Sequence, residues 1–107
     1  MNYRLSDAAV DDLQAAVDHY GSISRGLAIS LIEDVARCLK LISNNPYVGR
    51  TIGERFRRIP LNHYPFFLIY QVESEHVFVV SVYHQKRHPE YWRDRIQEEA
   101  AIYRLAA

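Results

Sequence analysis

Apolar and polar positions follow two different periods along the chain, and each period predicts one type of element. Tyr3 and Leu5 alternate with polar neighbours, which is typical of a short strand. Ser6 then stands where a helix N-cap is expected. The apolar residues that recur next at helical spacing are Val10, Leu13, Val17 and Tyr20. Gly21 is expected to end this first helix, because glycine is favoured just beyond a helix C-terminus.

A second helix is expected to begin between Ser24 and Leu27 and to end at 44–46, since Pro46 disfavours helical geometry in the residue before it. Its predicted apolar side consists of Ala28, Leu31, Ile32, Val35, Leu39 and Ile42. Its predicted polar side consists of Glu33, Asp34, Arg37 and Lys40. The short break at Gly21 predicts that the two helices form an antiparallel hairpin.

After the turn-prone stretch 46–53, the period changes from that of helices to that of strands. Three candidate strands, Arg55–Leu61, Phe66–Val72 and His76–His84, are separated by short turns and therefore predict an antiparallel meander. A final helix is expected from about Glu90. This order predicts an α+β fold, in which an N-terminal strand and a helical hairpin accompany an antiparallel sheet, followed by a C-terminal helix. The hairpin should cover one face of the sheet, and the other face must meet water, a partner or the last helix.

Composition narrows the class of protein. The 107 residues suffice for one domain, which we place at 1–107. Thirteen basic residues balance thirteen acidic ones, whereas a general nucleic-acid binder usually has a basic surplus. Cys38 is the only cysteine, so an internal disulfide and a thiol metal site are excluded, and a cytoplasmic location is expected.

Several functional classes find no support in the sequence. There is no glycine-rich phosphate loop, no zinc-ligand spacing and no nucleophile elbow. The longest apolar run, 66–70, is too short to cross a bilayer. We therefore expect no metal, no cofactor, no small-molecule substrate and no membrane partner.

Two clusters of basic and aromatic residues remain as candidates for function. The first contains Arg55, Arg57 and Arg58 on the first meander strand, and the second contains His84, Lys86, Arg87, Tyr91 and Trp92. A histidine can transfer protons at neutral pH, arginines can hold phosphate, and aromatic rings can stack on bases. His84 with Arg58 and Arg87 is thus chemically sufficient to cut RNA through its 2′-hydroxyl.

Each of these residues also has an ordinary structural explanation. Arginines on a strand often keep an exposed sheet soluble, and Lys86 can be a solvated charge. His84 has the same parity as Phe78, Val80 and Val82 and can be a half-buried residue at a strand end. Trp92 can anchor a terminal helix to the core. The residues alone leave the catalytic and structural explanations open.

Five segments, taken together and in order, resemble the RelE/ParE toxin superfamily. They are YRLS at 3–6, NPYVGR at 45–50, RRIPL at 57–61, YPFFLIY at 64–70 and VYHQKRHPEYW at 82–92. The last is the most specific, because a histidine and an arginine three residues apart follow a valine-rich strand and precede proline and tryptophan. The resemblance implies a compact sheet packed by a helical hairpin. It also implies a cognate antitoxin, whose tail wraps around the toxin and keeps it inactive.

The superfamily contains two branches with different activities. RelE-like members cut mRNA on the ribosome, whereas ParE-like members poison DNA gyrase by binding and lack the nuclease residues. The Pro65–Tyr70 run, the 89–92 ending and the zero net charge favour the ParE-like branch. The resemblance therefore implies a plasmid-stabilisation type of toxin that causes growth arrest without being an enzyme. Its target-binding residues are expected to be Arg57, Arg58, Lys86, Arg87, Tyr91 and Trp92.

Two alternatives stay open. In the first, the chain is a ribosome-dependent endoribonuclease, with His84, Arg87 and Arg58 as catalytic residues. In the second, it is a non-toxic relative that only binds a partner.

Overall fold

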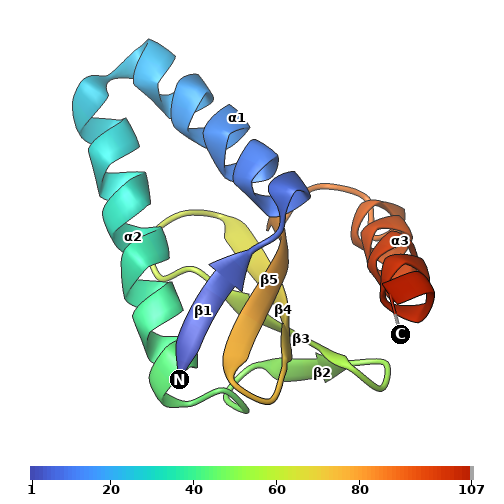
Figure 1. The fold of residues 1–107 in the computed structure, drawn as a ribbon. Helices are drawn as coiled ribbons and strands as arrows, with labels where there is room; N and C mark the ends of the chain where they lie inside the picture. The colour runs from blue at the N-terminus through green and yellow to red at the C-terminus, as the bar shows by residue number, and fades with distance from the viewer. Residues whose placement is uncertain (107) are drawn as a thin grey trace.

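Two helices pack their apolar sides on one face of a five-stranded sheet, and a third helix packs on the other face (Figure 1). The computed structural model describes the backbone of residues 1–106 and the side chains of residues 1–102. Its elements are β1 (Asn2–Leu5), α1 (Asp7–Ile23), α2 (Arg25–Asn44), β2 (Arg50–Ile52), β3 (Phe56–Pro60), β4 (Phe66–Val72), β5 (His76–His84) and α3 (Glu90–Ala106). The α+β prediction, the helical hairpin, the three-strand meander and the C-terminal helix are confirmed.

The sheet has the strand order β1-β5-β4-β3-β2, and it is mixed rather than wholly antiparallel. Strands β2 to β5 pair antiparallel, while β1 pairs parallel with β5 from Asn2↔His76 to Leu5↔Val79. The expectation of a purely antiparallel sheet is therefore corrected at β1. The alternation within a strand carries no information about the direction of a partner more than seventy residues away.

A short strand, β2, occupies part of the stretch that was expected to form only turns. It pairs with β3 from Arg50↔Arg58 to Ile52↔Phe56. Three residues are too few to show a period, so the strand left no pattern in the sequence. Gly53, in the turn that follows, has a φ of 61°, a conformation that glycine adopts without steric cost.

The boundary between α1 and α2 lies at Ser24 and not at Gly21. The N-cap prediction for Ser6 is confirmed, since its Oγ accepts a hydrogen bond from the Ala9 N–H at 3.1 Å. Helix α1 continues to Ile23, and Ser24 in extended backbone donates its N–H to the Tyr20 carbonyl. The Ser24 hydroxyl then caps α2 by accepting from the Leu27 N–H. One residue thus ends one helix and begins the next.

The predicted sides of α2 need two corrections. Asp34, placed on the polar side by its residue type, is 1% exposed, whereas Ile32, placed on the apolar side, is 48% exposed. Asp34 follows Leu31 and precedes Cys38 at helical spacing, so it points into the core with them. Its carboxylate accepts backbone N–H groups from residues 62, 63 and 64 at 3.2, 2.8 and 3.1 Å. Geometry, rather than polarity, decides the side.

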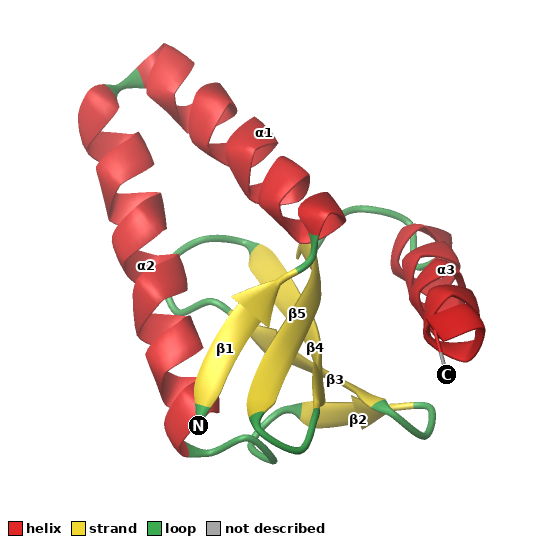
Figure 2. Ribbon diagram, in the orientation of Figure 1, coloured by secondary structure: helices red, strands yellow, loops and turns green. Residues whose placement is uncertain are grey.

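Helices α1 and α2 lie on one side of the sheet and α3 lies on the other (Figure 2), and the two faces of the sheet bury different clusters. The face under α1 and α2 holds the larger core, which includes Leu31, Val35, Ile42, Leu68, Tyr70 and Val79. The opposite face holds a smaller cluster of Phe56, Ile69, Val80 and Tyr83. Against it pack Tyr91, Trp92 and Ile96 from α3. We call these the hairpin face and the α3 face.

Candidate functional site

A β-bulge in β5 decides which face each candidate residue occupies. Ile69 pairs with Ser81 and Tyr70 pairs with Val79, so Val80 is an extra residue without a partner across β4. Beyond the bulge the alternation is reversed. Tyr83 lies with Val80 on the α3 face, while His84 lies opposite Phe66 on the hairpin face. The expectation that His84 shares a face with Phe78 and Val80 is therefore wrong, whereas His84 does share its face with Val82.

The structure places His84 and Arg58 on opposite faces of the sheet. The imidazole of His84 makes an edge contact with the Phe66 ring, which belongs to the hairpin-face core, at a centroid distance of 5.2 Å. Arg58 pairs with Ile69, and its guanidinium lies 5.0 Å from the centroid of the Phe67 ring on the α3 face. The sheet thus separates two of the three residues expected for RNA cleavage.

The neighbouring arginine, Arg57, is used inside the protein. It pairs with Tyr70 and so points to the hairpin face. Its Nη1 donates to the carbonyls of Tyr47 and Gly49 at 3.0 and 2.8 Å, and its guanidinium lies over the Tyr47 ring. Arg57 therefore holds the segment before β2 in place, while Arg58 faces the other side of the sheet.

Four of the expected target-binding residues gather on the α3 face: Arg58, Arg87, Tyr91 and Trp92. The Arg87 guanidinium lies 4.3 Å from the centroid of the Tyr91 ring, which packs on the same cluster as Tyr83. Lys86 is exposed in the turn before Arg87, and its N–H donates to Nδ1 of His84 at 3.0 Å. The connection between β5 and α3 therefore carries the basic residues to the border of this face.

The aromatic residues beneath Arg58 form a stack. The rings of Phe67 and Tyr83 lie 5.4 Å apart with an angle of 28° between them. Burial raises the pKa of the Tyr83 hydroxyl, and the neighbouring Arg58 guanidinium opposes that shift. Tyr83 is only 3% exposed, so it supports Arg58 from below rather than offering a surface of its own.

Trp92 borders a hollow of about 340 Å³ between α3 and the β2–β3 turn. The residues that line it include Ile52, Phe56 and Ile96, with Arg55 and Arg93 at its rim. One side of the indole packs on the α3-face cluster, and the Arg93 guanidinium lies 5.3 Å from its centroid. Trp92 is therefore both an anchor for α3 and part of the accessible surface.

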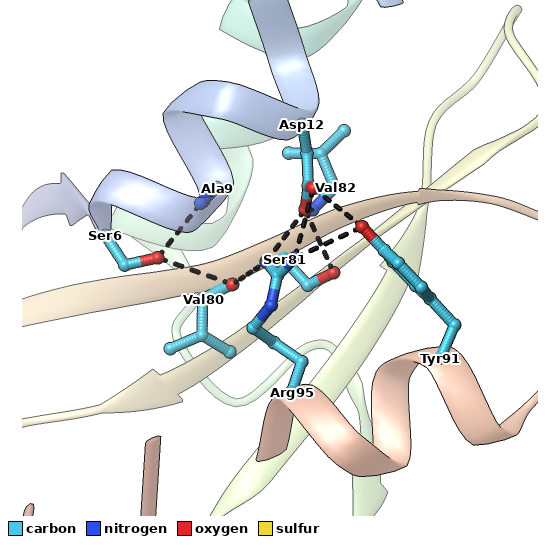
Figure 3. Close-up of polar contacts among 8 residues, drawn as sticks. All are labelled: Ser6, Ala9, Asp12, Val80, Ser81, Val82, Tyr91 and Arg95. Atoms are coloured by element: carbon cyan, nitrogen blue, oxygen red, sulfur yellow. Dashed lines mark hydrogen bonds and ion pairs between the residues drawn. The ribbon is translucent and has the colours of Figure 1, made fainter. Parts of the chain in front are cut away.

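Asp12 is the centre of a polar network that was not foreseen from the sequence (Figure 3). Its Oδ1 accepts from the Tyr91 hydroxyl at 2.8 Å and from Nη2 of Arg95 at 3.2 Å. Its Oδ2 accepts from the Ser81 hydroxyl, the Val82 N–H and Nη1 of Arg95 at 3.3, 3.0 and 2.9 Å. The network thus joins α1, β5 and α3.

This network also satisfies backbone groups at the β5 bulge. The Val80 carbonyl accepts from Nη1 of Arg95 at 2.9 Å and from the Ser6 hydroxyl at 3.4 Å, while Asp12 accepts the Val82 N–H. The partners of Asp12 lie 69 to 83 residues away along the chain, so local pattern gave no sign of them. Asp12 also lies near the N-terminus of α1, the positive end of the helix dipole.

The charges in the network stabilise one another. Burial opposes the charge of Arg95, but the hydrogen bonds and the charge of Asp12 outweigh it and raise the pKa of the guanidinium. Burial, followed by the hydrogen bond and charge of Asp12, raises the pKa of the Tyr91 hydroxyl. Arg95 thus stays charged and Tyr91 stays a neutral donor at physiological pH.

Within residues 1–106, no group of three or more histidine, cysteine or acidic side chains is placed to share a metal ion. None of the helices in that part of the chain is both long and apolar enough to cross a membrane.

The chain was compared with known proteins. It matches no curated protein. A solved structure described as the chromosomal ParDE TA system from P. aeruginosa is similar with a TM-score of 0.68 and 23% identity, over 78% of this chain and 95% of that one. At that identity the likeness establishes the fold. The family model for the ParE toxin of the type II toxin–antitoxin system parDE matches residues 3–89. That match covers well over half of the chain, which therefore belongs to the ParE toxin family of type II toxin–antitoxin systems.

Proposed function

We propose that the chain arrests growth by binding DNA gyrase through its α3 face, and that an antitoxin neutralises it. The observation that carries this proposal is the separation of His84 from Arg58 by the sheet. A nuclease of the expected kind needs the proton-transfer group and the arginines on the same phosphate. A binding surface has no such requirement, and the ParE family match supports the same choice.

The arginines of the α3 face suit docking onto a protein or nucleoprotein surface. Among the described residues, Arg58 and Arg87 lie over aromatic rings and have no carboxylate within ion-pair distance. A guanidinium that stacks on a ring keeps its N–H edge available for carboxylates or phosphates. Arginine and aromatic residues of this kind supply much of the binding energy at protein interfaces.

We propose that the antitoxin binds at the β1 edge of the sheet. Strand β1 lies at an edge of the sheet (Figure 1). Beside it is a hollow of about 640 Å³ lined by residues of β1, α2 and the β4–β5 turn. Tyr3, which lines this hollow, is exposed. An extended segment can pair with an open strand edge while its apolar side chains pack beside it, which suits a disordered tail that folds on binding.

Inducible expression without antitoxin tests the proposed target. We expect growth arrest with a DNA-damage response and no codon-phased mRNA cleavage. His84→Ala should remain toxic, Arg58→Ala and Arg87→Ala should lose toxicity, and the exposed Arg37→Ala is the matched control. Codon-phased cuts that disappear in His84→Ala would establish the ribonuclease alternative. The absence of arrest with full-length folded protein would leave the non-toxic alternative.

Rescue by the antitoxin encoded beside the toxin tests the proposed neutralising surface. Co-expression should restore growth for the unmodified chain. Tyr3→Lys places a charge on the β1 edge and should weaken rescue, whereas Ile23→Lys, at an exposed position at the end of α1, should leave rescue intact. Equal rescue of both variants would exclude the β1 edge.

A further inference from the structure

The Asp12 network has a consequence for the residues that are proposed to touch the target. We infer that Asp12, although it lies on α1, is a positioning residue that holds the Arg87 guanidinium in place through Tyr91. The inference rests on the proposed function for its biological meaning, since Arg87 belongs to the proposed gyrase-binding face. Its structural part concerns Asp12, Tyr91 and Arg87 alone and can be tested separately.

The contacts form a continuous path. Oδ1 of Asp12 accepts from the Tyr91 hydroxyl at 2.8 Å, and the Arg87 guanidinium lies 4.3 Å from the centroid of the Tyr91 ring. Residues 85–90 are exposed, and the Arg87 backbone N–H donates to the His84 carbonyl and closes a turn. An exposed arginine on such a turn has many rotamers. The Tyr91 ring selects among them. Asp12 fixes the ring through the hydroxyl, both directly and by holding Arg95, whose Nη2 donates to the same hydroxyl at 3.1 Å.

The identity of residue 12 matters because its carboxylate is surrounded by donors. It receives two N–H groups of Arg95, the Tyr91 and Ser81 hydroxyls and the Val82 N–H, with side-chain exposures of 9% for Asp12 and 12% for Arg95. An asparagine has the same shape, but its amide group would turn donors toward Arg95 or Tyr91. Asp12→Asn should therefore loosen α3 while leaving the hairpin core untouched.

The coupling crosses the end of the family match. Asp12 and Val82 lie within residues 3–89, whereas Tyr91 and Arg95 lie beyond them on α3. The match therefore conveys nothing about this network. A charge on the hairpin side of the molecule sets the geometry of the turn that precedes α3.

The first test needs no target. The Nε–H resonance of Arg87 in an NMR spectrum is shifted by the ring current of Tyr91 while the guanidinium lies over that ring. Asp12→Asn and Tyr91→Phe should both move this resonance toward its value in Arg87 of an unfolded chain, and the neighbouring exposed Asp11→Asn should not. Tyr91→Phe keeps the ring and removes the hydroxyl, so it remains informative if Asp12→Asn fails to fold. An unchanged resonance in Tyr91→Phe overturns the inference.

The second test measures binding to purified gyrase. Asp12→Asn should weaken binding about tenfold in the natural chain, and it should have no further effect when Arg87→Ala is already present, because coupled residues are not additive. Additive losses would mean that Asp12 acts through general stability and would overturn the inference. If Arg87→Ala itself leaves gyrase binding unchanged, the proposed binding face fails, while the resonance test still decides whether Asp12 positions Arg87.

Discussion

The buried carboxylate of Asp34 gives the sharpest stability prediction, because it accepts three backbone N–H groups of the loop between β3 and β4 and so holds that loop to α2. Oδ1 accepts the Asn62 N–H, and Oδ2 accepts the N–H groups of His63 and Tyr64. Asp34→Ala removes the acceptor for all three groups and leaves space beside Leu31 and Cys38 in the core. The hydrogen bond from the Tyr64 hydroxyl to the Leu27 carbonyl, at 2.8 Å, would then remain between the loop and α2, and β3 and β4 would keep their own pairing.

The magnitude follows from opposing effects. A hydrogen bond to a charged group contributes about 1.5–3 kcal/mol, but Asn62 and His63 are exposed, so water can replace part of this. Removing a carboxylate that is 1% exposed also relieves its desolvation. We expect a net loss of about 2–4 kcal/mol in the free energy of unfolding for Asp34→Ala. In Asp34→Asn the amide oxygen can take the place of Oδ2 as an acceptor, so the free energy of unfolding should fall by only about 1–2 kcal/mol.

Urea unfolding monitored by circular dichroism measures these differences. The urea midpoint should decrease in the order natural chain, Asp34→Asn, Asp34→Ala. In thermal unfolding, the Tm of the alanine variant should fall by roughly 8–16 °C. The exposed neighbour Glu33→Ala is the control and should stay within about 0.5 kcal/mol of the natural chain. A free energy for Asp34→Ala as close as that to the natural value would refute the assignment of Asp34 as the loop anchor.

Three further predictions concern single residues. Gly49→Ala should cost about 1–3 kcal/mol in urea unfolding, because a Cβ there would lie 2.6 Å from the Tyr70 hydroxyl, whereas Gly26→Ala in α2 should be neutral or stabilising; equal stabilities would contradict this. Ser24→Ala should cost about 1 kcal/mol through loss of the α2 cap, and an unchanged Tm would exclude that role. Burial, and then the charge of Asp34, raise the pKa of the Cys38 thiol to about 11 from an ordinary 9.0. The thiol of the unfolded chain ionises at a lower pH than the buried thiol, so the free energy of unfolding should fall as the pH rises from 9.0 to about 11. The fall should be less steep in Cys38→Ala, and equal slopes in the two proteins would contradict the raised pKa of the thiol.

Much of the fold could be predicted because its signals are local. The bounds of β4 and β5 match the expected strands, and α3 begins at the expected Glu90. The parallel pairing of β1 could not be predicted, because it depends on a partner far along the chain. Strand β2 was too short to have a period, and the limit of α1 was misplaced because Ser24, rather than Gly21, provides the cap.

The candidate site was harder to predict, because one inserted residue reverses the faces of a strand. Val80 gives no sign in the sequence that it is bulged, yet the bulge moves His84 away from Arg58. The roles of two acidic residues on the helices also could not be predicted from local pattern. Asp12 and Asp34 bind backbone groups of distant segments, and only the assembled fold brings those groups within reach.

The proposal that the α3 face binds gyrase is tested most directly by a supercoiling assay with purified components. At molar excess over gyrase, the natural chain should inhibit supercoiling or trap cleaved DNA, and His84→Ala should do the same. Arg58→Ala and Arg87→Ala should restore supercoiling, while Arg37→Ala should remain inhibitory. Full gyrase activity in the presence of excess folded toxin, or inhibition that depends on His84 and not on the two arginines, would contradict the proposal.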